Sequence, residues 1–149
     1  MNHNIFAVPI EGPAWPEIER SLLARPEGSS AFWIVTANPE ILLEARRDPT
    51  YAETLRQADL RTVDGIGLWL ALRLRGENTT RVTGVRLAEH LLALAAEKKW
   101  KVALLGGRDP LTATRASETL RSRFPSLRLV AEQGGIVQPD GQMNDHGEE

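Results

Sequence analysis

Short apolar runs alternate with amphipathic segments along most of this chain. An apolar run of about four to eight residues predicts a buried strand, whereas apolar positions spaced three and four apart predict a helix. The runs predict strands over residues 5–10, 32–36, 58–63, 101–105 and 127–131. The spaced patterns predict helices over residues 16–24, 39–47, 49–57, 68–74, 84–98 and 110–124. Strands that alternate with helices indicate an α/β fold: a Rossmann-like, mainly parallel sheet with helices on both faces.

Two helix starts and the end of the pattern are marked in the sequence. Asn38-Pro39 and Asp48-Pro49 each place a capping side chain before a proline at the first helical position. Residues 138–149 are polar and almost without apolar side chains, which predicts a loop or a disordered tail. We therefore expect the folded core to span residues 1–137. Because that core stops soon after a strand, we expect a fold truncated at its C-terminus.

Composition narrows the class of protein. The 149 residues carry a formal net charge of −2, so no general basic field for nucleic acid exists and no nucleic-acid partner is expected. The chain has no cysteine, which excludes disulfides and thiol chemistry and suits a reducing cytoplasm. No apolar run approaches the roughly 18 residues needed to cross a bilayer. The amino-terminal residues also lack the pattern of a signal peptide.

The most informative motif is Asp64-Gly65-Ile66-Gly67. It lies between the predicted strand 58–63 and the predicted helix 68–74. Ligands of α/β proteins bind at the carboxyl ends of the strands, where helix N-termini present backbone N–H groups to anions. Asp64 therefore occupies a place that suits a catalytic base. Capping of a helix beside a turn explains the same acid and stays open as the alternative.

Two further motifs have comparable positions. Thr36-x-Asn38-x-Glu40 follows the predicted strand 32–36, and Arg81-Val82-Thr83-Gly84 directly precedes the predicted helix 84–98. Together with the Asp64 motif and the later Leu104-Leu105-Gly106-Gly107, their order and spacing resemble the WecG/TagA/CpsF family of bacterial glycosyltransferases (glycosyltransferase family 26). The resemblance covers residues from about 5 to 137.

The resemblance implies an activity. Members of this family transfer a sugar, often N-acetylmannosamine, from a UDP donor to undecaprenyl-diphosphate-linked N-acetylglucosamine, with inversion at the anomeric carbon. The products feed wall teichoic acid, enterobacterial common antigen or capsule synthesis at the cytoplasmic face of the membrane. The family is not known for a metal-binding D-x-D motif, and this chain contains none. The resemblance thus implies neither a metal nor another cofactor, the UDP-sugar being a substrate.

Residue roles follow from the same resemblance. Asp64 matches the proposed general base, and a positioned carboxylate of this kind contributes about 10²–10⁴-fold by taking the proton of the attacking hydroxyl. Thr36 and Asn38 match residues of the substrate pocket, where hydroxyl and amide groups orient a sugar by hydrogen bonding. Simple capping of the following helix is the alternative for Asn38.

The cationic and glycine motifs match the part of the family site that holds the nucleotide. Arg81 matches an arginine near the donor diphosphate, where a guanidinium stabilises the charge of departing UDP. A surface ion pair with Glu77 or Glu89 is the alternative. Gly106 and Gly107 could let backbone N–H groups approach the nucleotide, although a plain strand-to-helix turn explains them as well.

Several features depart from the family pattern. Arg86 stands where the family usually has an acid, and Ile136 and Val137 stand where aromatic residues are common. The family core normally continues for several dozen residues, and many members add a basic tail that docks on the membrane. We therefore expect little or no turnover from this chain alone. Apolar surface left by an unfinished sheet would favour a homo-oligomer.

Two other functions stay open. One is a non-catalytic nucleotide-sugar-binding remnant of the same family. The other is a flavodoxin-like or receiver-like interaction domain. Receivers carry a cluster of acids at the end of the first strand, and its absence after residues 5–10 counts against that class.

Overall fold

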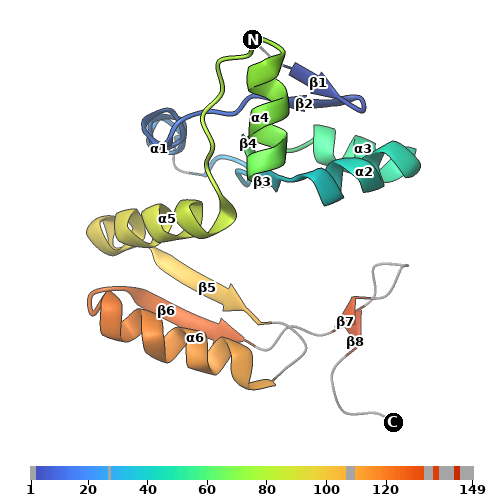
Figure 1. Ribbon diagram of the computed structural model, residues 1–149. Helices are drawn as coiled ribbons and strands as arrows, with labels where there is room; N and C mark the ends of the chain where they lie inside the picture. Colours follow the sequence, from blue (N-terminus) through green and yellow to red (C-terminus); the bar gives the residue numbers. More distant parts are fainter. Residues whose placement is uncertain (1–2, 27, 107–109, 133–135, 138–142, 145–149) are drawn as a thin grey trace. The chain divides into compact units, whose positions relative to one another are not determined.

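The computed structural model describes residues 3–26, 28–106, 110–132, 136–137 and 143–144. The chain forms two compact units, Met1–Ala88 and Glu89–Glu149, and the division falls inside helix α5 (Gly84–Lys98) (Figure 1). The N-terminal unit contains, before α5, the elements β1 (His3–Ile5), β2 (Val8–Ile10), α1 (Trp15–Leu23), β3 (Ile34–Ala37), α2 (Pro39–Arg47), α3 (Pro49–Arg56), β4 (Leu60–Val63) and α4 (Ile66–Leu74). After α5, the C-terminal unit contains β5 (Lys101–Leu105), α6 (Pro110–Arg123), β6 (Arg128–Glu132), β7 (Ile136–Val137) and β8 (Met143–Asn144).

The predicted α/β class with parallel strand pairing is confirmed. β3 pairs with β4 in parallel, with Thr36 opposite Thr62 and Ala37 opposite Val63. Val63 also forms an isolated parallel bridge with Arg81, and the Val82 N–H donates to the Val63 carbonyl at 3.0 Å. The segment that precedes α5 therefore runs alongside β4. The carboxyl ends of β3 and β4 and the start of α5 consequently share one edge.

The prediction of one strand over residues 5–10 is wrong. These residues form an antiparallel hairpin, β1–β2, in which Ile5 pairs with Val8. Phe6 and Ala7 turn the chain at φ values of 50° and 65°, a left-handed backbone that glycine or asparagine usually provides in two-residue hairpins. Because the turn lacks those residues, the apolar run reads as a continuous strand.

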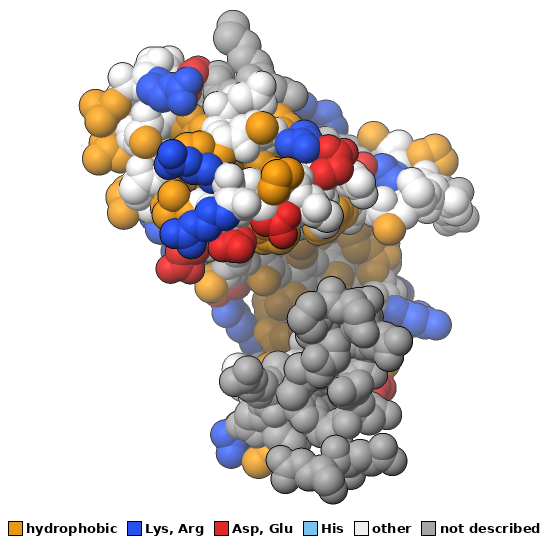
Figure 2. All heavy atoms as spheres, turned by 90° about the vertical axis from the view of Figure 1, so that its right-hand side faces the viewer, with side chains coloured by type: hydrophobic (Ala, Val, Ile, Leu, Met, Phe, Trp, Pro, Cys, Tyr) orange, Lys and Arg blue, Asp and Glu red, His pale blue; other side chains and the backbone are white. Residues whose placement is uncertain are grey.

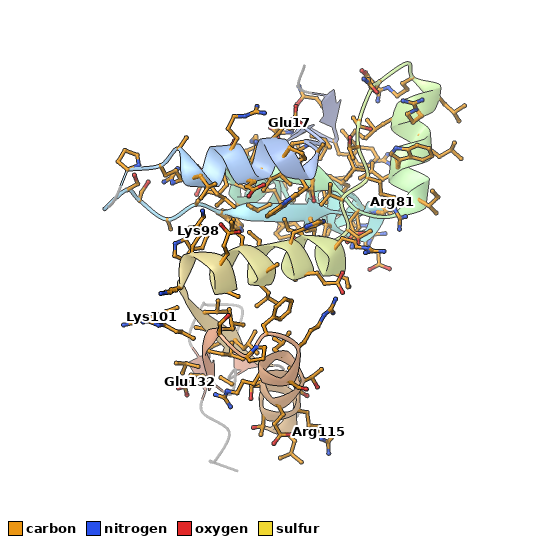
Figure 3. The ribbon with its side chains drawn as sticks, turned by 90° about the vertical axis from the view of Figure 1, so that its left-hand side faces the viewer. Glu17, Arg81, Lys98, Lys101, Arg115 and Glu132 are labelled. Atoms are coloured by element: carbon orange, nitrogen blue, oxygen red, sulfur yellow. The ribbon has the colours of Figure 1, made fainter. Side chains whose placement is uncertain are left out.

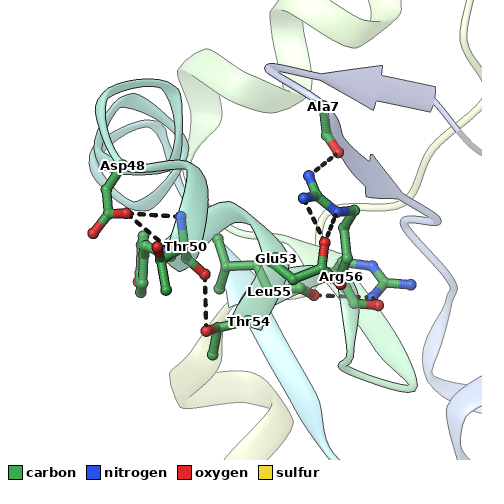
Figure 4. A network of polar contacts seen from close by, with 9 residues as sticks. Ala7, Asp48, Thr50, Glu53, Thr54, Leu55 and Arg56 are labelled. Carbon is green, nitrogen blue, oxygen red and sulfur yellow. Dashed lines mark hydrogen bonds and ion pairs between the residues drawn. The ribbon is translucent and has the colours of Figure 1, made fainter.

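The predicted starts of α2 and α3 are confirmed. Asn38 Oδ1 accepts a hydrogen bond from the Ile41 N–H at 2.9 Å. Asp48 Oδ1 accepts from the N–H groups of Thr50 and Tyr51 at 2.8 and 3.1 Å, part of the network in Figure 4. At the other end of α3, Arg56 pairs with Glu53 and donates to the Ala7 carbonyl. This contact fastens α3 to the turn of the hairpin.

The core of the N-terminal unit lies between its strands and helices α2, α3 and α4. Its fully buried members include Val8, Ile10, Leu42, Val63 and Leu72. All of these apolar side chains lie in segments that the sequence predicted as strands or helices. The strands that carry the Thr36 and Asp64 motifs are thus held against a packed interior.

A buried ion pair lies at the edge of this core. Arg61, only 6% exposed, donates to Glu11 Oε1 at 2.6 Å and to the carbonyls of Leu55, Arg56 and Ala58. An arginine is tolerated inside a protein when its donors are satisfied in this way. The pair ties the segment after β2 to β4.

The C-terminal unit repeats the strand–helix–strand pattern. β5 and β6 pair in parallel from Lys101 opposite Arg128 to Leu105 opposite Glu132. Ala95, Leu127 and Leu129 form the buried centre of this unit. β7 and β8 pair in antiparallel fashion. Two residues of the segment expected as a loop or tail, Met143 and Asn144, thus form a strand, and the other residues of 138–149 lie outside the described residues.

Candidate functional site

Three chain segments meet at the carboxyl ends of β3 and β4. The Asp64 N–H donates to the Ala37 carbonyl at 2.7 Å, which joins the residue after β4 to the last residue of β3. Thr62 Oγ1, fully buried in β4, donates to the Val82 carbonyl at 3.0 Å. These bonds hold the third segment, which leads into α5, beside the other two. The edge is therefore fixed by hydrogen bonds between segments far apart in the sequence.

The Asp64 carboxylate faces the start of α5. Asp64 Oδ2 accepts from the backbone N–H of Gly84, the first residue of α5, at 3.0 Å. The helix that directly follows Asp64, α4, has Gly65 at its N-cap and no side-chain cap. The acid thus binds the N-terminus of a helix 20 residues away. No other hydrogen bond to its carboxylate is found among the described residues, so Oδ1 remains able to accept a proton.

Gly84 sets how closely the functional side chains approach. A Cβ atom at this position would lie 3.3 Å from Thr36 Oγ1 and 3.6 Å from Asp64 Oδ2. The hydroxyl of Thr36 and the carboxylate of Asp64 therefore converge on one point. The structure brings together these two predicted site residues, both half-buried. Their roles in substrate binding and catalysis stay predictions.

Asn38 follows Thr36 by two residues, and one of its two polar side-chain atoms already has a partner. Its Oδ1 caps α2 through the Ile41 N–H, as described above. Its amide nitrogen makes no hydrogen bond with the residues that the structure describes. The capping alternative is thus correct for the oxygen, while the two N–H donors remain for a ligand.

Arg81 enters the site edge through its backbone. The bridge to Val63 fixes its position, while its side chain is exposed (Figure 3). Within the described parts of the chain, no ion pair of Arg81 is found. Glu89, one of the two partners considered for it, pairs with Arg123 at 2.9 Å. A role of the guanidinium in binding the donor diphosphate stays a prediction.

The glycine motif after β5 belongs to the C-terminal unit. Gly106 donates its N–H to the Glu132 carbonyl at 2.9 Å, and a Cβ atom here would lie 2.6 Å from Ala113 Cβ. Close packing of the turn against α6 therefore explains Gly106 without a nucleotide. Gly107 lies outside the described residues. Binding of a nucleotide by this pair stays a prediction.

Sequence reasoning missed one support of the site edge, Gly12. Gly12 follows β2 with φ +56°, and a Cβ atom here would lie 2.9 Å from Thr79 Cβ. Its N–H donates to the Arg61 carbonyl, and its carbonyl accepts from the Thr80 N–H, both at 3.1 Å. Gly12 therefore links β4 to the segment that carries Arg81. The turn-forming sequence Glu11-Gly12-Pro13 was the available signal.

Metal-binding clusters and membrane-spanning helices are both absent from the described residues. No group of three or more histidine or acidic side chains there is arranged to hold a metal ion. No helix in the same part of the chain is long and apolar enough to span a membrane.

Fold and site together define an α/β protein with an acid, a hydroxyl and helix N-termini at the carboxyl edge of parallel strands, where such proteins bind ligands. The chain belongs to the WecG/TagA/CpsF family of glycosyl transferases, whose sequence profile matches residues 3–146. The family resemblance predicted from the motifs is thereby confirmed.

Two curated relatives carry the same name, N-acetylglucosaminyldiphosphoundecaprenol N-acetyl-beta-D-mannosaminyltransferase. The relative from Bacillus spizizenii (strain W23) is 33% identical over 120 residues, which cover 80% of this chain and 46% of the relative. The relative from Staphylococcus aureus (strain NCTC 8325) is 32% identical over 111 residues, which cover 74% of this chain and 43% of the relative. The chain thus spans less than half the length of the curated relatives it matches.

Proposed function

We propose that this chain forms the part of a glycosyltransferase that activates the acceptor. The reaction moves N-acetylmannosamine or a related sugar from a UDP donor to undecaprenyl-diphosphate-linked N-acetylglucosamine. The convergence of Thr36 Oγ1 and Asp64 Oδ2 on Gly84 is the observation that carries the proposal. The names of the two relatives support the choice of sugar and acceptor.

Asp64 acts as the general base in this proposal. A sugar hydroxyl of the acceptor attacks the anomeric carbon of the donor, and its proton passes to the Asp64 carboxylate as the new C–O bond forms. The bond between the anomeric carbon and the diphosphate breaks on the opposite face, and UDP leaves with the bonding electrons. Attack opposite the leaving group inverts the anomeric centre.

The neighbouring polar groups orient substrates and balance charge. Thr36 Oγ1 and the free amide donors of Asn38 hydrogen-bond to sugar hydroxyls or an N-acetyl group. The exposed guanidinium of Arg81 pairs with the departing diphosphate, so that the proposal needs no metal ion. The lipid-linked acceptor places the enzyme at the cytoplasmic face of the membrane as a peripheral protein.

Binding of the nucleotide sugar without turnover is the second candidate. Arg86, exposed in the first turn of α5, favours it, because the family usually has an acid at this position. Arg86 adds a positive charge near the start of α5, the helix whose first N–H group binds the Asp64 carboxylate. Transfer could fail while the pocket still recognises UDP-sugar.

One experiment separates these candidates. The 149-residue chain is mixed with UDP-N-acetylmannosamine, first alone in a calorimeter and then with a lipid-diphosphate N-acetylglucosamine analogue while UDP release is measured. We expect saturable binding of the nucleotide sugar. Binding with UDP release and disaccharide product supports transfer. Binding alone supports the second candidate if UDP release is still missing after the chain is extended with the C-terminal part of the Bacillus spizizenii relative. If the chain binds no UDP-sugar, both candidates are wrong.

A further inference from the structure

An apolar groove of about 520 Å³ lies in the N-terminal unit between the β1–β2 turn, α2 and α4. Its floor and walls are mostly apolar, formed by Phe6, Leu42, Leu43, Leu68 and Ala71. Arg75 is the basic residue among those that line it. The groove thus offers an elongated apolar ligand a surface with a cation on its border.

The groove begins where the candidate site ends. Pro39 and Gly67 line it, and they follow Asn38 and the Asp64-Gly65 turn closely in the chain. The two turns also lie against each other, since a Cβ atom on Gly65 would be 3.4 Å from Pro39 Cδ. The groove and the candidate site are therefore neighbours in the fold.

Apolar side chains gather around this groove instead of being scattered. Leu43 and Phe6 line it while remaining 44% and 41% exposed. Ile66, Leu70 and Leu74 are also exposed on α4, but they lie on a face of this helix that does not line the groove. Figure 2 shows hydrophobic side chains among basic and acidic ones on the face of this unit that is turned toward the viewer. Exposed apolar groups that gather in this way mark an interaction site.

Positive charge borders the same surface. The Arg46 guanidinium lies 5.2 Å from the centre of the Phe6 ring, and Arg75 contributes to the groove itself. Both cations lie toward the C-terminal ends of α2 and α4, at the opposite ends of these helices from Pro39 and Gly67. A second copy of the chain is a poorer occupant, because a symmetric interface places the same surface of both copies together and gathers their arginines in one contact.

We propose that this groove binds the polyprenyl tail of the lipid-linked acceptor. This inference rests on the proposed function, which places the acceptor's sugar at Asp64. The isoprene chain is apolar and offers no hydrogen bonds, so it suits walls of leucine, alanine and phenylalanine. Its diphosphate, between sugar and tail, would lie at the border between the polar site and the groove.

Binding of acceptor analogues with different tails tests the groove. Fluorescent N-acetylglucosaminyl diphosphates that carry either a ten-carbon or a longer prenyl chain are titrated against the full 149-residue chain by anisotropy, below micelle-forming concentrations. We expect the longer tail to bind more tightly. Leu43→Glu should weaken its binding roughly tenfold, the effect of losing one buried leucine contact, while binding of the short-tail analogue stays unchanged.

Leu23→Glu is the matched control. Leu23 lies on α1, is 46% exposed against 44% for Leu43, and does not line the groove. The control should bind both analogues like the unaltered chain. Equal losses in the two variants, or no dependence on tail length, would overturn the groove assignment. If the analogues bind independently of tail length while UDP-sugar binds normally, the proposed function stands and the groove inference alone fails.

Photo-crosslinking tests the same proposal without a substitution. A long-tail analogue with a diazirine in its third isoprene unit is irradiated with the unaltered chain, and the labelled peptides are identified. We expect labels on α2, α4 and the β1–β2 turn. Labels confined to other elements would contradict the proposal, and so would concentration-dependent dimerisation that Leu43→Glu abolishes, since the groove would then hold a second copy.

Discussion

The carboxyl edges of the two parallel strand pairs differ in how they are held. At the end of β3–β4, side-chain and backbone hydrogen bonds join three segments, from Thr62 Oγ1 to the Val82 carbonyl and from the Gly84 N–H to Asp64 Oδ2. At the end of β5–β6, the described contacts are the Gly106 N–H bond to Glu132 and close packing on Ala113. One edge presents an acid and a hydroxyl at a fixed point, whereas the described residues of the other edge present backbone.

The strands that end at these two edges also differ in burial, and β4 is the more buried. β4 buries Arg61, Thr62 and Val63, whereas Leu105 at the end of β5 is 71% exposed. Catalysis depends on groups held within a fraction of an ångström by their surroundings. The N-terminal unit provides that support, which is why we place the chemistry there.

The largest expected effect is the loss of the base. Asp64→Asn should lower sugar transfer by about 10²–10⁴-fold in any preparation that shows turnover, because the amide cannot take the acceptor proton. The asparagine oxygen can still accept from the Gly84 N–H, so folding should be preserved. Initial rates of UDP release measure the effect, with circular dichroism as the check on folding.

Glu40→Gln is the control for this substitution. Glu40 is an exposed acid in the first turn of α2, so its change removes a nearby charge without touching Asp64. It should retain the transfer rate. If Asp64→Asn keeps the transfer rate, Asp64 is not the general base. The reason for placing the chemistry at the β3–β4 edge would then be lost.

The next effect concerns the support beneath the site. Arg61→Ala should lower the free energy of unfolding by about 3–5 kcal/mol, because it leaves Glu11 and three carbonyls without their buried partner. Arg47→Ala removes a surface pair with Glu44 and should cost about 1 kcal/mol or less. Urea unfolding measures both, and equal losses would show that burial gives the Arg61 pair no special weight.

A smaller effect should appear in the C-terminal unit. Gly106→Ala places a methyl group 2.6 Å from Ala113 Cβ, so overpacking should cost about 1–3 kcal/mol. Hydrogen exchange should then accelerate in residues 89–149 and change little in residues 1–88. Gly67→Ala, whose added methyl meets open space, should keep normal exchange in both units. Acceleration throughout the chain would show that the units do not differ in stability.

The smallest effect separates the two roles of Asn38. Asn38→Ala removes the cap of α2 and should cost about 1 kcal/mol, whereas Asn38→Asp keeps a capping oxygen and should cost little. Both variants remove the amide donors and should weaken UDP-sugar or acceptor binding alike. Thermal unfolding and calorimetry measure the two properties. Unchanged ligand binding in both variants would leave Asn38 with capping alone.

Local signals predicted the fold better than the contacts of the site. The Asn-Pro and Asp-Pro pairs located α2 and α3 because a cap and its helix are adjacent in sequence. The left-handed turn at Phe6 and Ala7 was missed because neither residue type signals it. The alternation of strands with helices was sufficient to predict parallel pairing.

The site was predicted only as a set of neighbouring motifs. That Thr36 and Asp64 would share an edge follows from parallel strands, and the structure agrees. Asp64 binds the start of α5 and not of α4, a contact between residues 20 positions apart that no local rule specifies. The Glu11–Arg61 pair joins residues 50 apart and was equally beyond local reasoning.

Gly84 gives the site an uneven tolerance to mutation. A Cβ atom here would already touch Thr36 Oγ1 and Asp64 Oδ2, so side chains larger than that of alanine should displace one of these two groups. The next residue, Val85, is 73% exposed and should accept most substitutions. A saturation-mutagenesis library should therefore show few functional variants at position 84 and many at position 85.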